Sequence, residues 1–184
     1  QTFFKELKCS QSEPYYVMLQ ADGDHMGAAI RELTNQTDPI EKHRRLSDAL
    51  ACFAERAIAI VEDQHNGSLI YSGGDDVLAL LPLHTALACA QALSNEFVTI
   101  IERAYLNLSK RPTLSVGLAV VHHLEHMGRA RNLARDAEKL AKRQRNSLAI
   151  IVDKRSGGTF SVGGTWDEQP SPLPVRIEKW MKLL

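Results

Sequence analysis

The segment Gly73-Gly74-Asp75-Asp76 is the feature that most restricts how this chain can fold. Short apolar runs flank it at 68–72 and 77–81, and two such runs around a glycine-rich turn predict a β-hairpin. The turn then holds two carboxylates side by side. Neighbouring carboxylates repel each other and one is pushed toward protonation, so the crowding gives the fold nothing and indicates a bound divalent cation.

A partner carboxylate for such a cation lies upstream. The strand-like run 15–21 ends in Asp22-Gly23-Asp24. If this strand pairs beside the hairpin, Asp22 and Asp75 come within reach of shared metal ions. Mg²⁺ prefers oxygen ligands and keeps waters and substrate phosphates in its remaining positions, and two ions about 3.5–4 Å apart can assist a displacement at phosphorus. The alternative is two acidic turns that cap strands and face water; we favour the metal site.

Composition sets the class of protein. The 184 residues carry no net charge and are 44% hydrophobic, which suits one globular domain with a core. Zero net charge restricts any nucleic-acid contact to a local patch. The three cysteines are far apart and form no CxxC pair, so neither a zinc knuckle nor a disulfide framework is predicted. No segment approaches a membrane span and no signal peptide is visible, so we expect a cytoplasmic protein without membrane contact.

Hydrophobic periodicity predicts the element order β-α-β-β-α-β-α-β. Asp38 as N-cap, Pro39 at the first position and Glu41 at the third predict the start of the first helix, and Asn66-Gly67 ends it. After the hairpin we expect a helix over about 83–106, a strand over 113–121, a helix from 127 to about 146 and a strand over 148–153. This order predicts an α+β fold: a ferredoxin-like palm with a central antiparallel sheet and helices packed on one face.

The domain boundaries follow from the same pattern. Residues 1–14 are expected as an N-terminal lead-in, 15–166 as the palm, and 167–184 as a proline-rich linker with the start of a following helix. Because the chain begins with Gln1, we also expect it to be a piece of a longer protein.

At these motifs the sequence resembles a known family. The paired Gly73-Gly74-Asp75-Asp76 and Asp22-Gly23-Asp24 motifs resemble the palm of the large subunit of type III CRISPR effector complexes, the CRISPR polymerase-cyclase. Asp22 to Gly27 and Lys154 to Gly158 are similar to its Cmr branch, and Ser115 to Ala119 resembles a fourth-strand motif shared with diguanylate cyclases. The resemblance covers roughly residues 15–166.

The resemblance implies an activity: on binding target RNA, such a complex joins ATP into cyclic oligoadenylate second messengers for antiviral defence. It implies that Asp22 and Asp75 are metal ligands, with Asp76 a ligand or close support, and that the Gly23 carbonyl is a backbone ligand to two Mg²⁺ or Mn²⁺ ions. The glycines Gly73 and Gly74 would let the triphosphate approach the turn. Lys142 stands where related cyclases have a lysine that meets the terminal phosphates.

The implied partners are the other subunits of the complex, guide RNA and target RNA. A second palm-like domain or chain is expected to complete the site, which leaves the isolated fragment inactive. The family's nuclease is not expected here, because the chain has no His-Asp dipeptide. Arg135 and Lys139 replace an aspartate and a tyrosine of the related cyclases, which puts the base and phosphate contacts in question.

Other interpretations of the same residues agree less well with the sequence. A diguanylate-type cyclase using GTP usually has an acid and then Phe after the glycines, whereas Val77 follows Asp76. A catalytically silent scaffold palm would have no reason to keep clustered carboxylates. An EF-hand loop starting at Asp22 would lack its oxygen ligand at Met26 and its Glu at Leu33.

Two further groups of residues have a simpler explanation. The histidine-rich segment His122 to His126 is expected to be a solvated loop, since it lacks the helical spacing of a zinc protease. The basic helix from Arg129 to Arg145 is expected to present a solvated face, with RNA contact as the open alternative, and Lys142 itself is assigned to phosphate. For Asp24, metal binding and a role as an exposed turn carboxylate that stabilises the following loop are equally good explanations.

Overall fold

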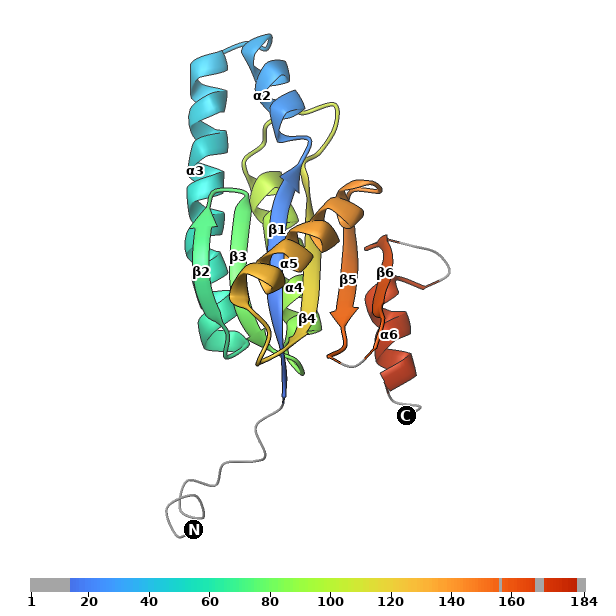
Figure 1. Cartoon of the computed structure of the whole chain (residues 1–184). Coiled ribbons are helices and arrows are strands. Elements are labelled where there is room, and N and C mark those ends of the chain that lie inside the picture. The colour runs from blue at the N-terminus through green and yellow to red at the C-terminus, as the bar shows by residue number, and fades with distance from the viewer. Residues whose placement is uncertain (1–13, 156, 168–170, 182–184) are drawn as a thin grey trace.

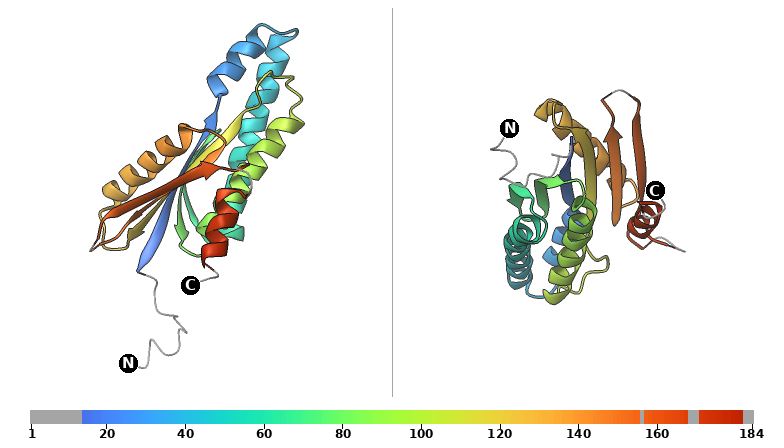
Figure 2. Two further views of the ribbon diagram at one scale, coloured as in Figure 1. Left: turned by 90° about the vertical axis from the view of Figure 1, so that its right-hand side faces the viewer. Right: turned by 90° about the horizontal axis from the view of Figure 1, so that it is seen from below.

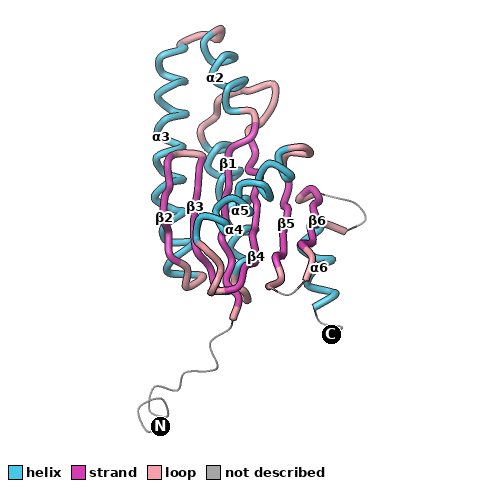
Figure 3. Tube along the Cα trace, in the orientation of Figure 1, coloured by secondary structure: helices cyan, strands magenta, loops and turns pink. Residues whose placement is uncertain are grey.

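Six strands form one sheet in the order β2-β3-β1-β4-β5-β6 (Figures 1 and 3). The structure is a computed structural model that describes residues 14–155, 157–167 and 171–181. The strands are β1 (Tyr15–Asp24), β2 (Ser68–Gly73), β3 (Asp76–Pro82), β4 (Thr113–His122), β5 (Ser147–Asp153) and β6 (Thr159–Thr165). The helices are α2 (Met26–Thr34), α3 (Pro39–Ile58), the π-helical turn η1 (Ala59–Gln64), α4 (Ala86–Arg103), α5 (Met127–Lys142) and α6 (Leu173–Met181).

The unit β1-α3-β2-β3-α4-β4 has the connectivity of a ferredoxin-like palm. Strand β1 lies between β3 and β4 and pairs antiparallel with both, and β2 pairs antiparallel with β3. Helix α5 then carries the chain to β5, which runs parallel to β4, and β6 closes that edge antiparallel. The predicted α+β palm is therefore confirmed, with one parallel strand pair in an otherwise antiparallel sheet.

Both faces of the sheet are covered, which corrects the expectation that all helices pack on one face. Helices α3 and α4 lie on one face, where Phe53 and Phe97 meet edge to face with ring centroids 5.0 Å apart. Helix α5 crosses the opposite face over β1 and β4 (Figure 2). The reason lies in the central strands: Met18, Ala119 and Val121 are buried against α5, so β1 and β4 are apolar on both sides.

Two elements were not predicted. The first is α2, which follows the acidic end of β1. Only Ala29 and Leu33 of this helix are buried, and two apolar positions are too few to predict a helix from the sequence. The second is β6, an edge strand in which Gly163 and Gly164 replace the apolar residues that mark a strand.

The ends of two predicted elements also differ. Helix α3 begins at Pro39 as predicted, but Asp38 adopts a left-handed conformation with φ 56° and its side chain caps nothing. An N-cap side chain normally needs an extended backbone to reach the first turn, so this part of the prediction was wrong. Helix α5 ends at Lys142 rather than near Asn146, and Arg145 and Asn146 take left-handed conformations in the turn that follows.

The structure describes only part of the two segments that flank the predicted palm. Most of the expected lead-in, 1–13, and residues 168–170 lie outside the described residues. Within the segment expected as a linker, Leu173 is completely buried in the core on the α3 and α4 side. No helix in the described part of the chain is long and apolar enough to span a bilayer.

Candidate functional site

The end of β1 and the β2–β3 turn meet at the acidic motifs. Ala21 lies opposite Val77 in the β1–β3 register, so Asp22 and Asp76, one residue beyond, are neighbours at the edge of the turn. The turn itself folds over β1, since a Cβ atom added to Gly23 would lie only 2.6 Å from Asp75 Oδ2. The structure thus brings together the three carboxylates that the sequence singled out, and only glycine at position 23 permits the approach.

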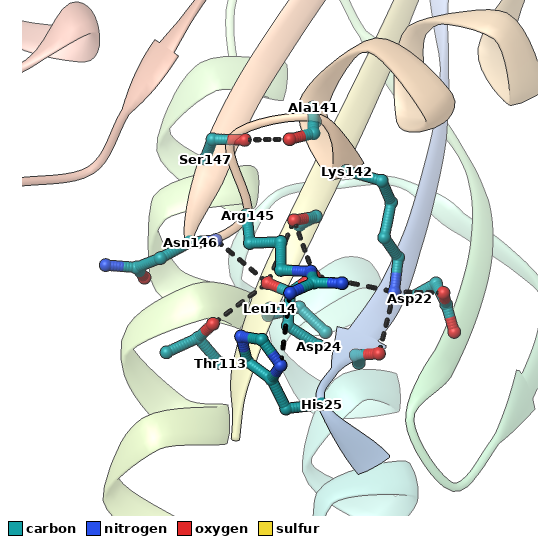
Figure 4. A network of polar contacts seen from close by, with 12 residues as sticks. Asp22, Asp24, His25, Thr113, Leu114, Ala141, Lys142, Arg145, Asn146 and Ser147 are labelled. Atoms are coloured by element: carbon teal, nitrogen blue, oxygen red, sulfur yellow. Dashed lines mark hydrogen bonds and ion pairs between the residues drawn. The ribbon is translucent and has the colours of Figure 1, made fainter. Parts of the chain in front are cut away.

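Lys142 reaches this acidic end from the last turn of α5 (Figure 4). Its Nζ forms an ion pair with Asp22 Oδ2 and donates a 2.7 Å hydrogen bond to the Gly23 carbonyl. The same ammonium lies 3.5 Å from Asp24 Oδ1. A cationic group therefore sits on the two oxygens, from Asp22 and Gly23, that the resemblance assigns to a metal.

Asp24 is buried, with 1% of its surface exposed, and its carboxylate holds the site together. Thr113 Oγ1 and Ser115 Oγ donate to it at 2.9 Å, and the backbone N–H of Asn146 donates at 2.8 Å (Figure 4). These donors join β1, β4 and the turn after α5. The expectation of an exposed turn carboxylate that stabilises the following loop was wrong, because Asp24 is buried and its donors lie on β4 and in the turn after α5.

Burial, together with the neighbouring carboxylates, raises the pKa of three carboxyl groups at the site. Burial of its carboxyl group raises the pKa of Asp76 to about 7, helped by a hydrogen bond to Asp22 and repulsion from Asp22 and Asp75. Burial raises the pKa of Asp75, and repulsion from the Asp22 carboxylate adds to the rise. A hydrogen bond from its own backbone N–H and the charge of Lys142 oppose it. Glu138 on α5, which the sequence reasoning missed, also has a raised pKa from burial and from Asp22. The site carries more negative charge than Lys142 alone offsets.

Glycine is needed at positions 73 and 74 for different structural reasons. Gly73 pairs with Asp76, so Gly74 is the first of the two residues that connect the strands. It has φ +83°, and type II′ hairpin turns favour glycine at this position. At Gly73 a Cβ would fall 1.8 Å from the hydroxyl of Tyr71, whose ring lies across that glycine. Their predicted contact with a triphosphate stays a prediction.

The residues present fit a magnesium-type cation in part. Asp22, Asp76 and the Gly23 carbonyl offer the oxygen donors that Mg²⁺ prefers, and Lys142 stands there as a cation. Among the described residues, however, no three His, Cys, Asp or Glu side chains are grouped as a metal site. Such a cation would complete its coordination with water and substrate phosphates, as Mg²⁺ commonly does.

The histidine segment lies far from these carboxylates. Tyr15 pairs with His122 and Asp24 with Thr113, so the two ends of β4 separate the histidines from the acidic site. His122 and His123 stack on each other with ring centroids 4.5 Å apart, in a turn that is largely exposed. The expectation of a solvated loop is confirmed, at the end of the sheet away from the site.

The basic residues of α5 do not act as one group. Arg129 pairs with Asp153 at 2.9 Å, and Lys139 lies 3.7 Å from Asp136. Arg135 is exposed and has no ion pair within the described residues. Among the basic residues of α5, Lys142 is the one for which the described structure shows an ion pair with Asp22.

The fold is that of a nucleotidyl cyclase-type palm. A class III adenylyl cyclase-like ATP-binding protein from Pseudomonas aeruginosa superimposes with a TM-score of 0.56 at 17% identity, covering 76% of this chain and 33% of that one. A Csm1–Csm4 cassette, crystallised in complex with cA4, gives a TM-score of 0.56 at 15% identity, covering 76% of this chain and 21% of that one. At these identities the likeness establishes the fold.

The family follows from the sequence comparison. Residues 15–149 match the sequence model of Cas10/Cmr2, second palm domain, and the chain belongs to that family. It is 34% identical over 171 residues to the CRISPR system Cmr subunit Cmr2 of Pyrococcus furiosus, an alignment that covers 79% of this chain. The chain spans 19% of the length of that relative. The predicted membership of the Cmr branch is confirmed.

Proposed function

We propose that this palm joins ATP into cyclic oligoadenylates as part of a type III CRISPR RNA-guided complex. Membership of the Cas10/Cmr2 family and the cyclase-type fold support a nucleotide cyclase-like role in such complexes. The observation that carries the proposal is the junction of β1 with the β2–β3 turn, where the Lys142 ammonium contacts Asp22 and the Gly23 carbonyl and where Asp76 is hydrogen-bonded to Asp22. The choice of adenine draws support from the related Csm1–Csm4 cassette, which was crystallised with cA4.

The reaction is a displacement at phosphorus. The 3′-hydroxyl oxygen of one nucleotide attacks the α-phosphorus of an ATP, a 3′–5′ phosphodiester bond forms, and the bond between the α- and β-phosphates breaks. Pyrophosphate carries away the bonding electrons and the hydroxyl proton passes to solvent. Most of the rate enhancement in such transfers comes from positioning and from charge stabilisation, which carboxylate-held cations and a lysine provide.

The roles of the residues follow from their positions. Asp22, Asp75, Asp76 and the Gly23 carbonyl would hold two Mg²⁺ or Mn²⁺ ions, which neutralise the phosphates and promote attack when bound. Lys142 would then be free of Asp22 and able to turn toward the terminal phosphates of ATP. Gly73 and Gly74 keep the turn open to the triphosphate, and Asp24 keeps β1 and β4 in register behind the site.

The proposal also includes partners. Another palm-like domain or chain would face this one across the acidic turn and complete the site, and other subunits would bring guide RNA and target RNA. A location in the cytoplasm remains part of this proposal. The isolated chain should therefore make little cyclic product, even when supplied with ATP and Mn²⁺.

The test replaces Asp75 and Asp76 with Ala in the full-length protein assembled in its complex. We expect loss of cyclic product, read by anion-exchange chromatography and mass spectrometry, with unchanged binding of target RNA. Asp136→Ala, an exposed carboxylate on α5 away from the turn, is the matched control and should leave synthesis intact. Normal synthesis by the double variant would refute the assignment of the turn.

A further inference from the structure

The turn between α5 and β5 joins the acidic site to the segment that follows β6. Its last residue, Asn146, takes a left-handed conformation with φ 44°, which asparagine adopts more readily than most residues. The backbone N–H of Asn146 donates to Asp24 Oδ2 at 2.8 Å (Figure 4). Its carbonyl accepts from the backbone N–H of Trp166 at 2.9 Å, and its side-chain Nδ2 donates to Asp167 Oδ2 at 2.6 Å. One residue thus connects the buried carboxylate of β1 with the residues after β6.

The same turn is bound to the end of α5. The carbonyl of Ala141 accepts a hydrogen bond from the backbone N–H of Arg145 at 3.0 Å and another from the hydroxyl of Ser147 at 2.5 Å. Lys142, the next residue along the helix, carries the ammonium that lies on the acidic site. Because Asn146 stands between Arg145 and Ser147, a shift of Asn146 moves the helix end that presents Lys142 as well as the N–H donated to the buried carboxylate.

Trp166 anchors the segment after β6 against β4. Its side chain is 7% exposed and belongs to the main core, and its indole N–H donates to the carbonyl of Leu114 at 3.1 Å. Leu114 lies opposite Gly23 in the β1–β4 register, so the anchor sits beside the backbone of the site. Asp167, the next residue, therefore extends from a fixed backbone position toward Asn146.

We propose that Asn146 is a positioning residue of the acidic site and that Asp167 holds it in place. The inference rests on the proposed function, because it concerns the carboxylates and the lysine of the same site. Asp167 is exposed, and the hydrogen bond that the structure shows for it is the one to Asn146. Asp167 thus acts on the reaction through Asn146, which holds Asp24 and the end of α5 in their places, and not through contact with substrate.

The first test follows Asn146 without metal and without catalysis. Amide hydrogen exchange of the full chain is measured in EDTA by two-dimensional NMR. Asp167→Ala removes the acceptor of the side-chain bond, and we expect the N–H of Asn146 to lose about tenfold of its protection. The amide of Ala149, which is buried in the middle of the sheet, reports global unfolding. It should keep its protection within about twofold, because a surface substitution changes global stability little.

Three variants separate this bond from a general effect of charge or stability. Asp167→Asn keeps an oxygen acceptor and should restore most of the protection at Asn146. Asn146→Gly tolerates the left-handed conformation but lacks the amide donor, so adding Asp167→Ala to it should cause no further loss. Asp63→Ala removes an exposed aspartate of η1, outside the network of Asp24, and should leave the protection unchanged.

The second test uses the full-length protein in its complex. A displacement of about 1 Å in a catalytic group can cost up to about a hundredfold in rate, so we expect Asp167→Ala to lower kcat for cyclic product about tenfold. Binding of target RNA and the melting temperature should stay unchanged, and Asp167→Asn should recover most of kcat. A residue that only stabilised the fold would alter the melting temperature and leave kcat intact.

Unchanged protection of Asn146 in Asp167→Ala would overturn the inference. So would an equal loss in Asp63→Ala, additive losses in the double variant, or full kcat in a variant whose Asn146 amide has lost its protection. Failure of the proposed function looks different, since it is signalled by continued synthesis when Asp75 and Asp76 are replaced, and the exchange measurement does not depend on it.

Discussion

Gly117 determines how closely α5 approaches the sheet, and its replacement tests whether that approach positions the site. Gly117 lies in β4 beneath α5, and a Cβ atom there would lie 2.1 Å from Glu138 N and 2.7 Å from Glu138 Cα. Ordinary contacts begin near 3.4 Å, so Gly117→Ala must push the helix backbone away by roughly 1.3 Å, a shift that backbone atoms in a packed layer resist. Lys142, four residues further along α5, would withdraw from Asp22.

The expected cost is that of overpacking a core, about 1–3 kcal/mol. For a domain of this size each kcal/mol lowers the melting temperature by about 2–4 °C, so a loss of about 4–8 °C corresponds to 2 kcal/mol. Thermal unfolding followed by circular dichroism measures this loss. Two-dimensional NMR of the Gly23 and Asp24 amides should report the withdrawal of Lys142.

Gly128→Ala is the matched control. Gly128 lies in the first turn of α5, and a Cβ there would meet no atom within 4 Å. Alanine also favours helix over glycine by up to about 1 kcal/mol, so this variant should be as stable as the unchanged protein or more so. A melting temperature for Gly117→Ala equal to that of Gly128→Ala would refute the argument that α5 rests on the glycine.

Two further predictions concern the carboxylates. Asp24→Ala leaves the hydroxyls of Thr113 and Ser115 without their buried acceptor, so we expect a loss of about 1–3 kcal/mol in urea unfolding. The exposed Asp136→Ala should lose under about 0.5 kcal/mol, and equal losses would contradict the structural role of Asp24. Since the pKa of Asp76 is raised from 3.8 to about 7 in the folded protein, that state holds the proton more tightly, and the free energy of unfolding in EDTA should fall as pH rises from about 4 to 7. Asp76→Asn should flatten this dependence, and an identical slope in the variant would show that another group is responsible.

The sequence fell short where an element has a weak apolar pattern and where only packing brings distant residues together. The glycine-rich hairpin, the acidic end of β1 and the helical repeats of α3, α4 and α5 were predictable, because period and turn chemistry are local properties. Helix α2 and strand β6 were not, since each has too few apolar residues to mark its period. Glu138 and Tyr71 gave no signal as site residues, because only packing brings α5 and β2 to the acidic turn.

The sequence by itself determined the chemistry of the site: carboxylates at Asp22, Asp75 and Asp76, glycines where the backbone must bend or come close, and the family to which the motifs point. The tertiary structure decided the rest. It placed α5 alone on the second face of the sheet, seated Lys142 on Asp22 and Gly23, and buried Asp24 among hydroxyl donors from β4. The physical reason is that charge neutralisation and hydrogen bonding act over a few ångströms, and residues 119 positions apart, such as Gly23 and Lys142, come that close only when the sheet and helix have packed.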